Sequence, residues 1–206
     1  MNPNSVPEFL QVPDAQIYLY KNFLYDGQAE RLYEELLENI EWQQDLIKFY
    51  GRKISLPRLT AWYGDAGISY TYSGILMQPH PWTLTLSQIK GWIESKTKYK
   101  FNSVLLNQYR NGNDSVAWHS DDEPELGKAP IIASLSLGAS RKFELRSKLQ
   151  PSSDKIEILL NSGDLIVMGG ETQQNWHHQI PKMRRVKEAR INLTFRNICI
   201  SMKQVD

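Results

Sequence analysis

The tripeptide His119-Ser120-Asp121 places an imidazole and a carboxylate two residues apart. In an extended backbone such residues point to the same side, so both side chains can contact one metal ion. A third ligand must come from farther along the chain, and the candidates are His177 and His178. Because adjacent residues of a strand face opposite sides, only one of them is expected to bind. Two histidines and one carboxylate, with the other positions open for a cosubstrate and O₂, are typical of non-haem Fe(II) oxygenases.

A second chemical pattern lies in the segment RINLTFR, residues 190–196, which alternates between polar and apolar side chains. Its polar face carries Asn192 and Thr194 and has Arg190 at one end and Arg196 at the other. Buried arginines are costly unless an anion pairs with them, and the guanidinium fork fits a carboxylate. With the metal motif upstream, this strand indicates a site for a small dicarboxylate such as 2-oxoglutarate. Without that motif, a half-exposed strand whose arginines meet solvent would be preferred.

Two further polar groups, Asn107 and Tyr109, share a face of an earlier predicted strand. An amide and a phenol at these positions could hydrogen-bond the same dicarboxylate.

Helices are expected in the first half of the chain. The apolar spacing predicts one helix over Asp26–Ile40, with Asp26 as its N-cap, and a second over about Trp82–Ser95, with Pro81 near its start. From Phe101 onward the periodicity changes to short runs rich in apolar and β-branched residues, separated by Gly, Pro, Asn and Ser. The predicted strands are 103–109, 131–137, 142–146, 155–160, 165–168 and 190–198.

Many short strands with turn signals between them favour an antiparallel sandwich or jelly roll. We therefore predict an α+β architecture, in which helices of the first half pack on one sheet of a β-core supplied by the second half. At 206 residues the chain is expected to form one domain.

Composition excludes several other classes. Hydrophobic residues make up 41% of the chain and charged residues 23%, which is ordinary globular usage. The single cysteine, Cys199, permits neither an intramolecular disulfide nor a multi-cysteine zinc site, so a reducing compartment is expected. No secretory signal and no run of about 18 apolar residues is visible. We expect a monomer without membrane contact, located in the cytoplasm, or in the nucleus of a eukaryotic host.

The formal net charge of +1 does not by itself indicate a nucleic-acid-binding protein. The positive charges are nevertheless clustered rather than spread evenly. One cluster comprises Lys48, Arg52, Lys53 and Arg58, and the other comprises Lys182, Arg184, Arg185, Lys187 and Arg190. Either cluster could be a solvated surface or a phosphate-binding surface.

Taken together, these motifs resemble the AlkB family of oxidative nucleic-acid demethylases, and most closely its branch of animal DNA-repair members. The resemblance covers roughly residues 56–197. Its motifs are HSDDE at 119–123, HQIP at 178–181, RINLTFR at 190–196, NQY at 107–109, PRLTAWYG at 57–64 and SYTYSG at 69–74.

The resemblance implies a double-stranded β-helix core. Residues 1–55 would be an N-terminal extension and helix of the same domain, and residues 56–206 a nucleotide lid and the dioxygenase core. His119, Asp121 and His178 would hold Fe(II). The residues implied for 2-oxoglutarate are Asn107, Tyr109, Arg190, Asn192, Thr194 and Arg196.

The resemblance also implies a base pocket. Tyr70 and Tyr72 would belong to the substrate lid, Asp122 and Glu123 would lie near the base edge, and Arg58 would reach the nucleotide backbone or a neighbouring base. Tyr50 falls where a duplex-repairing member places an intercalating hairpin, which suggests a wedge.

The function implied is Fe(II)- and 2-oxoglutarate-dependent repair of alkylated DNA, by demethylation of bases such as 1-methyladenine and 3-methylcytosine. Demethylation of RNA, or hydroxylation of a protein, by the same iron centre is the alternative. A binding module without a metal would leave the intact ligand set unexplained, and a zinc hydrolase would leave the two arginines unexplained.

Overall fold

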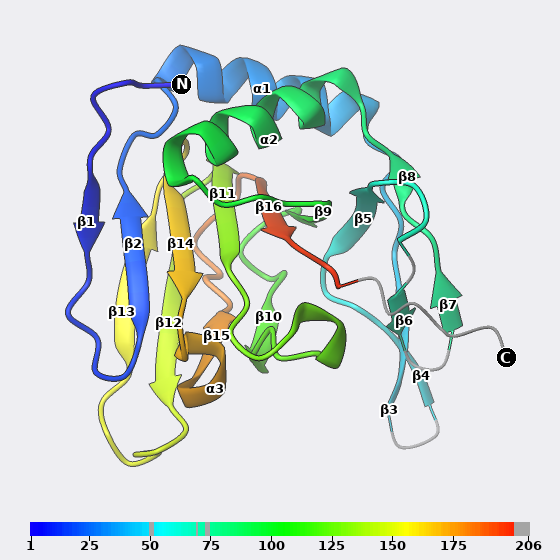
Figure 1. The fold of residues 1–206 in the computed structure, drawn as a ribbon. Helices are drawn as coiled ribbons and strands as arrows, with labels where there is room; N and C mark the ends of the chain where they lie inside the picture. Colours follow the sequence, from blue (N-terminus) through cyan, green and yellow to red (C-terminus); the bar gives the residue numbers. More distant parts are fainter. Residues whose placement is uncertain (50–51, 69, 73–74, 200–206) are drawn as a thin grey trace, which may run out of the picture.

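The computed structural model describes residues 1–49, 52–68, 70–72 and 75–199. Two long helices, α1 (Asp26–Asn39) and α2 (Leu84–Thr97), run side by side along the top of Figure 1. The Thr85 hydroxyl donates a hydrogen bond to the Glu35 carboxylate between them. The helices cover one face of a large sheet, and a smaller sheet faces the other side of that sheet.

The larger sheet has eight strands in the order β1-β2-β14-β11-β16-β9-β5-β8. All of its pairings are antiparallel except the one between β5 and β8. Its strands are β1 (Pro7–Phe9), β2 (Gln16–Tyr20), β5 (Leu59–Gly64), β8 (His80–Pro81), β9 (Ser103–Tyr109), β11 (Ile132–Gly138), β14 (Leu165–Gly169) and β16 (Arg190–Arg196).

The smaller sheet has four strands in the order β10-β15-β12-β13. These are β10 (Val116–His119), β15 (Trp176–Ile180), β12 (Arg141–Ser147) and β13 (Ile156–Leu160). Two hairpins, β3 (Leu46–Phe49) with β4 (Arg52–Ser55) and β6 (Tyr70–Tyr72) with β7 (Ile75–Met77), lie at the right of Figure 1. Two short helical turns, η1 (Pro124–Leu126) and α3 (Thr172–Asn175), complete the fold.

Strand β16 explains how the two faces of the larger sheet differ. Its residues Ile191, Leu193 and Phe195 are fully buried in the apolar cluster beneath α1 and α2. The intervening polar residues belong to the opposite face, which looks toward the smaller sheet. The alternation expected from the sequence is therefore confirmed, and it separates a packing face from a polar face on one strand.

The predicted jelly roll with helices packed on one sheet is confirmed, and all six predicted strands are present with shifts of one or two residues at their ends. The second half of the chain does not supply the whole β-core, in contrast to the prediction. Strands β1, β2, β5 and β8 of the larger sheet come from the first half of the chain. Their short length and mixed polarity gave no clear period, and pairing with longer strands determines their conformation.

The helix ends also differ from the prediction. The N-cap of α1 is Tyr25, without a side-chain cap, and Asp26 is the first helical residue, where its charge complements the helix dipole. Helix α2 begins after Thr83, whose hydroxyl accepts the Leu86 N–H at 3.1 Å. Pro81 instead belongs to β8. A local side-chain cap determined the start of α2, as is usual for helix N-termini.

Among the helices of the described residues, none is long and apolar enough to span a membrane.

Candidate active site

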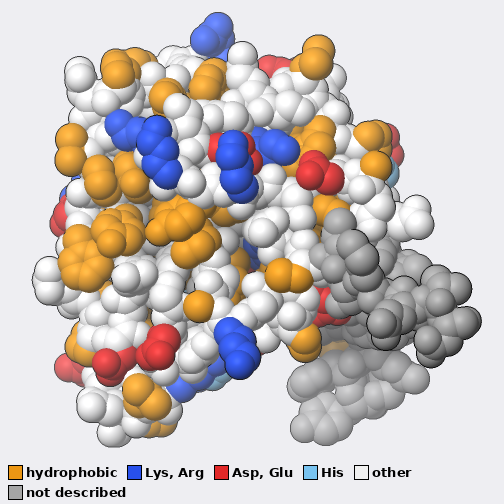
Figure 2. Space-filling model, viewed as in Figure 1, with side chains coloured by type: hydrophobic (Ala, Val, Ile, Leu, Met, Phe, Trp, Pro, Cys, Tyr) orange, Lys and Arg blue, Asp and Glu red, His pale blue; other side chains and the backbone are white. Residues whose placement is uncertain are grey.

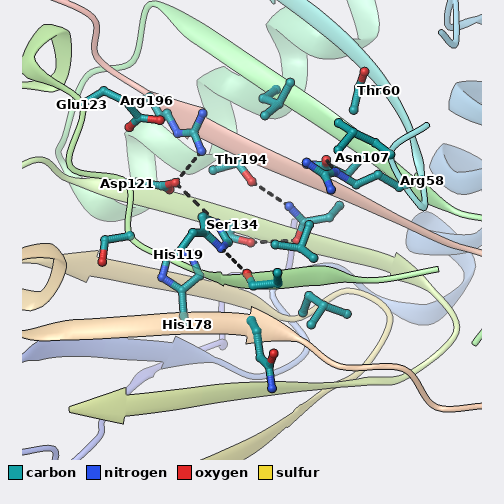
Figure 3. A pocket seen from close by; sticks show the side chains of 18 of the residues that line it. Arg58, Thr60, Asn107, His119, Asp121, Glu123, Ser134, His178, Thr194 and Arg196 are labelled. Atoms are coloured by element: carbon teal, nitrogen blue, oxygen red, sulfur yellow. Dashed lines mark hydrogen bonds and ion pairs between the residues drawn. The ribbon is translucent and has the colours of Figure 1, made fainter. Parts of the chain in front are cut away.

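Three side chains from two neighbouring strands and a loop converge at one end of the space between the sheets. His119 ends β10 and pairs in register with His178 of β15, and Asp121 follows β10 by two residues. Their possible ligand atoms all lie within 4.8 Å of one another. Figure 3 shows the three side chains pointing toward a common point. The pairing of β10 with β15 thus brings the HxD motif and a distant histidine together.

Each imidazole keeps a ring nitrogen available for a cation. The Nδ1 atom of His119 lies 2.8 Å from the carbonyl oxygen of Ala117, which can only accept, so Nδ1 is used as a donor there, and Nε2 lies 3.8 Å from Oδ1 of Asp121. His178 is buried against the ring of Phe143, with the centroids 5.3 Å apart. Burial, and then the neighbouring His119, lower the pKa of His178 to about 3. This imidazole is therefore neutral near pH 7.

Asp121 is kept ionised by its surroundings. It is 2% exposed, and its Oδ1 accepts a hydrogen bond from Nη2 of Arg196 at 2.7 Å. Burial acts to raise the pKa of this carboxyl, but the charge of Arg196 and the hydrogen bond from it, together with electrostatic interactions with the two neighbouring imidazoles, outweigh burial and lower the pKa to about 2. The result is a carboxylate beside two imidazoles, a donor set that suits Fe(II).

Of the two candidate histidines, the structure brings His178 to the cluster and not His177. The Nδ1 atom of His177 lies 3.1 Å from Oγ of Ser120, which also donates to the carbonyl of Trp176. Adjacent residues of β15 face opposite sides, as the strand geometry requires.

A cavity of about 420 Å³ begins at the three converging residues and extends between the sheets. Asn192 holds a hydrogen-bond network on its wall: its Oδ1 accepts from Ser134 at 2.9 Å, and its Nδ2 donates to Thr194 at 2.7 Å. Figure 3 shows this network beside the converging residues. The lining includes five of the six residues predicted for 2-oxoglutarate, namely Asn107, Tyr109, Asn192, Thr194 and Arg196.

The sixth, Arg190, is fully buried and is not part of the cavity lining. Its Nη2 donates to Ser136 at 2.9 Å and to Asn192 at 2.8 Å, and its guanidinium lies 5.2 Å from the ring centre of Tyr109. Its Nε and Nη1 atoms have no hydrogen-bond partner among the described residues. Burial lowers the pKa of Arg190 to about 10, so it remains a cation near pH 7. A buried cation with two unused donors fits a site for an anion.

The predicted nucleotide contacts are only partly brought to the cavity. Glu123 and Arg58 line it, and Arg58 donates from Nε to Oδ1 of Asn107 at 2.8 Å. Asp122 is exposed outside the lining and pairs with Lys148 at 3.1 Å. Its neighbour Asp121 is turned inward, so the side chain of Asp122 faces solvent, and its contact with a base edge stays a prediction.

The remaining predicted nucleotide contacts are three tyrosines. The backbones of Tyr70 and Tyr72 form β6, but their side chains lie outside the described part of the structure. Tyr50 lies outside the described residues, so its role as a wedge stays a prediction.

Among the described side chains on the face drawn in Figure 2, the positive charges form no continuous surface, because Lys and Arg are interspersed with acidic and apolar residues. Four members of the second predicted basic cluster are exposed in the loop after β15, namely Lys182, Arg184, Arg185 and Lys187, whereas the fifth, Arg190, is buried in β16. Of the first cluster, only Arg58 has a described side chain at the cavity.

Sequence reasoning missed three polar residues at or next to the site. Ser134 and Ser136 alternate with Ala133, Leu135 and Leu137 on β11, and this alternation could have revealed the polar face. Gln173, in contrast, lies in the four-residue turn α3 and is 1% exposed. No local pattern marks it.

Comparisons with known proteins agree with this geometry. Residues 16–196 match the family described as the 2OG-Fe(II) oxygenase superfamily. The chain is 44% identical over 192 residues to the human alpha-ketoglutarate-dependent dioxygenase alkB homolog 3, an alignment that covers 89% of this chain and 66% of that protein. It is 35% identical to the mouse DNA oxidative demethylase ALKBH2, covering 86% of this chain and 78% of that protein.

The chain therefore spans slightly less than two thirds of the length of the first of these relatives. Among solved structures, that of OsALKBH1 superposes with a TM-score of 0.63 at 17% identity, covering 93% of this chain and all of the other. At that identity the superposition supports the fold alone.

Proposed function

Because the chain belongs to the AlkB family within the 2OG-Fe(II) oxygenase superfamily, we propose that it repairs alkylated DNA by oxidative demethylation of bases such as 1-methyladenine and 3-methylcytosine. The observation that carries the proposal is the convergence of His119, Asp121 and His178 beside a cavity whose wall residues Tyr109 and Asn192 contact a buried arginine with unused donors. A metal site and an anion site within one cavity are what a 2-oxoglutarate-dependent oxygenase requires.

In this proposal, Nε2 of His119, the carboxylate of Asp121 and the imidazole of His178 hold the metal. The arrangement suits a cation, since Nε2 of His119 is not used by the contact with Ala117, His178 is neutral and Asp121 is ionised. Arg196 keeps the carboxylate in place through its 2.7 Å hydrogen bond. When bound, Fe(II) with 2-oxoglutarate and O₂ would supply oxidation of the N-alkyl carbon, giving the unmodified base, formaldehyde, succinate and CO₂.

The cosubstrate would be held along β9 and β16. Asn107, Tyr109 and Thr194 offer hydrogen-bonding groups on the cavity wall. Arg190 would pair with the carboxylate farther from the metal, because its Nε and Nη1 are available and burial makes an uncompensated charge costly. Arg196, near the metal ligands, would orient the other end of the diacid.

The base would enter the outer part of the cavity. The methylated edge is hidden inside a duplex, so the target must be single-stranded or flipped out, at a cost of a few kcal/mol. Trp62, Trp118 and Glu123 line the cavity and would offer aromatic and polar contacts to such a base. The lid tyrosines Tyr70 and Tyr72 remain candidates for stacking, which is worth about 1–3 kcal/mol per base.

The deciding experiment incubates the protein with Fe(II), 2-oxoglutarate and an oligonucleotide that carries 1-methyladenine or 3-methylcytosine, and follows the oligonucleotide by mass spectrometry. We expect loss of the methyl group together with succinate formation. Methylated RNA and a peptide are assayed in parallel, because all three substrates would use the same metal ligands. Succinate release stimulated by the peptide and not by either oligonucleotide would refute the repair function.

A further inference from the structure

Gln173 is a buried amide at the centre of the short turn α3, which connects β14 to β15. It is 1% exposed, although it lies in a segment of only four helical residues. Buried amide groups are nearly always hydrogen-bonded, so the partners of this side chain indicate what it stabilises.

Its main partner is the backbone of a proposed metal ligand. The Oε1 atom of Gln173 accepts the main-chain N–H of Asp121 at 2.9 Å, and this bond is fully buried. Since the N–H can only donate, the atom facing it must be the amide oxygen. The amide nitrogen then faces Sδ of Met168 at 3.5 Å, a weak acceptor that lines the same cavity. The side chain is thereby fixed in one orientation.

The same turn is bonded to the rest of the ligand-bearing loop. The carbonyl of Gln173 accepts from Nζ of Lys148 at 2.9 Å, and this ammonium also pairs with Asp122 at 3.1 Å. The hydroxyl of Ser120 donates to the carbonyl of Trp176 at 2.9 Å, directly after α3. His178 follows two residues later on β15. One short turn therefore links the loop of Asp121 to the strand of His178.

We propose that Gln173 is a positioning residue for the metal site, holding the main chain of Asp121 while Arg196 holds its side chain. The proposal rests on the proposed function, because it assumes that Asp121 binds a metal. Asp121 lies beyond the end of β10, where no strand pairing fixes its backbone. The bond from Gln173 replaces that pairing, so that the carboxylate meets the two imidazoles at a fixed position.

The test measures binding of Mn(II) to the full chain by electron paramagnetic resonance, through the signal of the free ion. Gln173→Met keeps the length and volume of the side chain but removes the acceptor. We expect its dissociation constant for Mn(II) to rise about 10- to 100-fold, as is typical when a group that supports a metal ligand is lost. The absorption spectrum of bound Co(II) should also change shape, which a general loss of stability would not cause.

Gln174→Met is the matched control, because the neighbouring glutamine is exposed and makes no contact with Asp121. Its affinity for Mn(II) should stay within about twofold of the unmodified chain, whereas metal-site variants usually lose tenfold or more. Gln173→Glu retains an acceptor oxygen at the same reach and should bind Mn(II) clearly more tightly than Gln173→Met. It also serves as the test variant if Gln173→Met does not fold.

Unchanged Mn(II) affinity in Gln173→Met, or an equal loss in Gln173→Met and Gln173→Glu, would overturn the positioning role while leaving the metal site intact. If only Gln173→Glu folds, a loss of Mn(II) affinity of more than about tenfold in that variant would also overturn the positioning role. Failure of the unmodified chain to bind Mn(II) would instead refute the proposed function, and the positioning role with it.

Discussion

Arg190 and Arg196 stand at the two ends of one strand face, yet their surroundings differ. Arg196 donates to the carboxylate of Asp121, so the chain supplies a counter-ion at the metal end of the cavity. Arg190 contacts a hydroxyl, an amide and the ring of Tyr109, and no carboxylate pairs with it among the described residues. A buried charge without a counter-ion is unfavourable. The difference indicates that the protein itself supplies the counter-ion of Arg196 and leaves that of Arg190 to a ligand.

The largest expected effect comes from removing the carboxylate at the metal end. Asp121→Ala should abolish both Mn(II) binding and demethylation, because it deletes a proposed ligand and the acceptor of the Arg196 hydrogen bond. The control is Asp122→Ala, one residue later, where the side chain is 56% exposed and pairs only with Lys148 among the described residues. A surface pair contributes about 0–1 kcal/mol, so this variant should keep its metal affinity. Equal losses in the two variants would contradict the assignment of Asp121.

At the other end of the strand, Arg190→Met should lower the affinity for 2-oxoglutarate without lowering the stability of the ligand-free protein. Removing an unpaired buried charge is expected to leave the ligand-free protein as stable as before, or more stable by about 1–4 kcal/mol. Affinity for 2-oxoglutarate should fall by about 2–5 kcal/mol, because the bound carboxylate loses its partner. Denaturant unfolding and titration calorimetry measure the two quantities.

Arg196→Met provides the contrast, since it leaves Asp121 buried without this cation and should destabilise the ligand-free protein. A change of stability with the same sign in both arginine variants would remove the distinction between the two ends.

Arg58→Met addresses a contact that the sequence and the structure assign differently. The sequence suggested that Arg58 reaches the nucleotide, whereas in the structure its Nε donates to Asn107 on the wall of the cavity. If this bond orients Asn107 toward the diacid, its loss should weaken 2-oxoglutarate binding by about 1.5–3 kcal/mol, the usual contribution of a hydrogen bond to a charged group. Steady-state KM values for both substrates are the measurement. A raised KM for the oligonucleotide alone would favour the nucleotide contact.

The smallest effect is expected on the opposite face of β16. Ile191 is fully buried beneath the helices, and Ile191→Val should lower the free energy of unfolding by about 0.5–1.5 kcal/mol. Affinity for 2-oxoglutarate should not change, because this side chain points away from the cavity. A marked loss of affinity would show that the two faces of the strand are not independent.

The sequence by itself determined what depends on local period and residue chemistry. The alternation of RINLTFR predicted both faces of β16, since successive side chains of a strand must point to opposite sides. The HxD spacing likewise indicated two ligands on one side of a strand end. The two long helices followed from their apolar spacing, although their first residues did not, because α1 has no side-chain cap and the start of α2 depends on a single bond from Leu86 to Thr83.

Only the tertiary structure decided what depends on strand order and on contacts between distant residues. The choice of His178 over His177 follows from its register with His119 across β10 and β15. Three further contacts of the site join residues that are 26 to 52 positions apart in the sequence. They are the pairs Asp122–Lys148, Arg58–Asn107 and Asp121–Gln173. A periodic pattern reports which way a side chain points, but its partner is determined by how the sheets pack. For this reason the chemistry of the site could be predicted from the sequence, while its geometry could not.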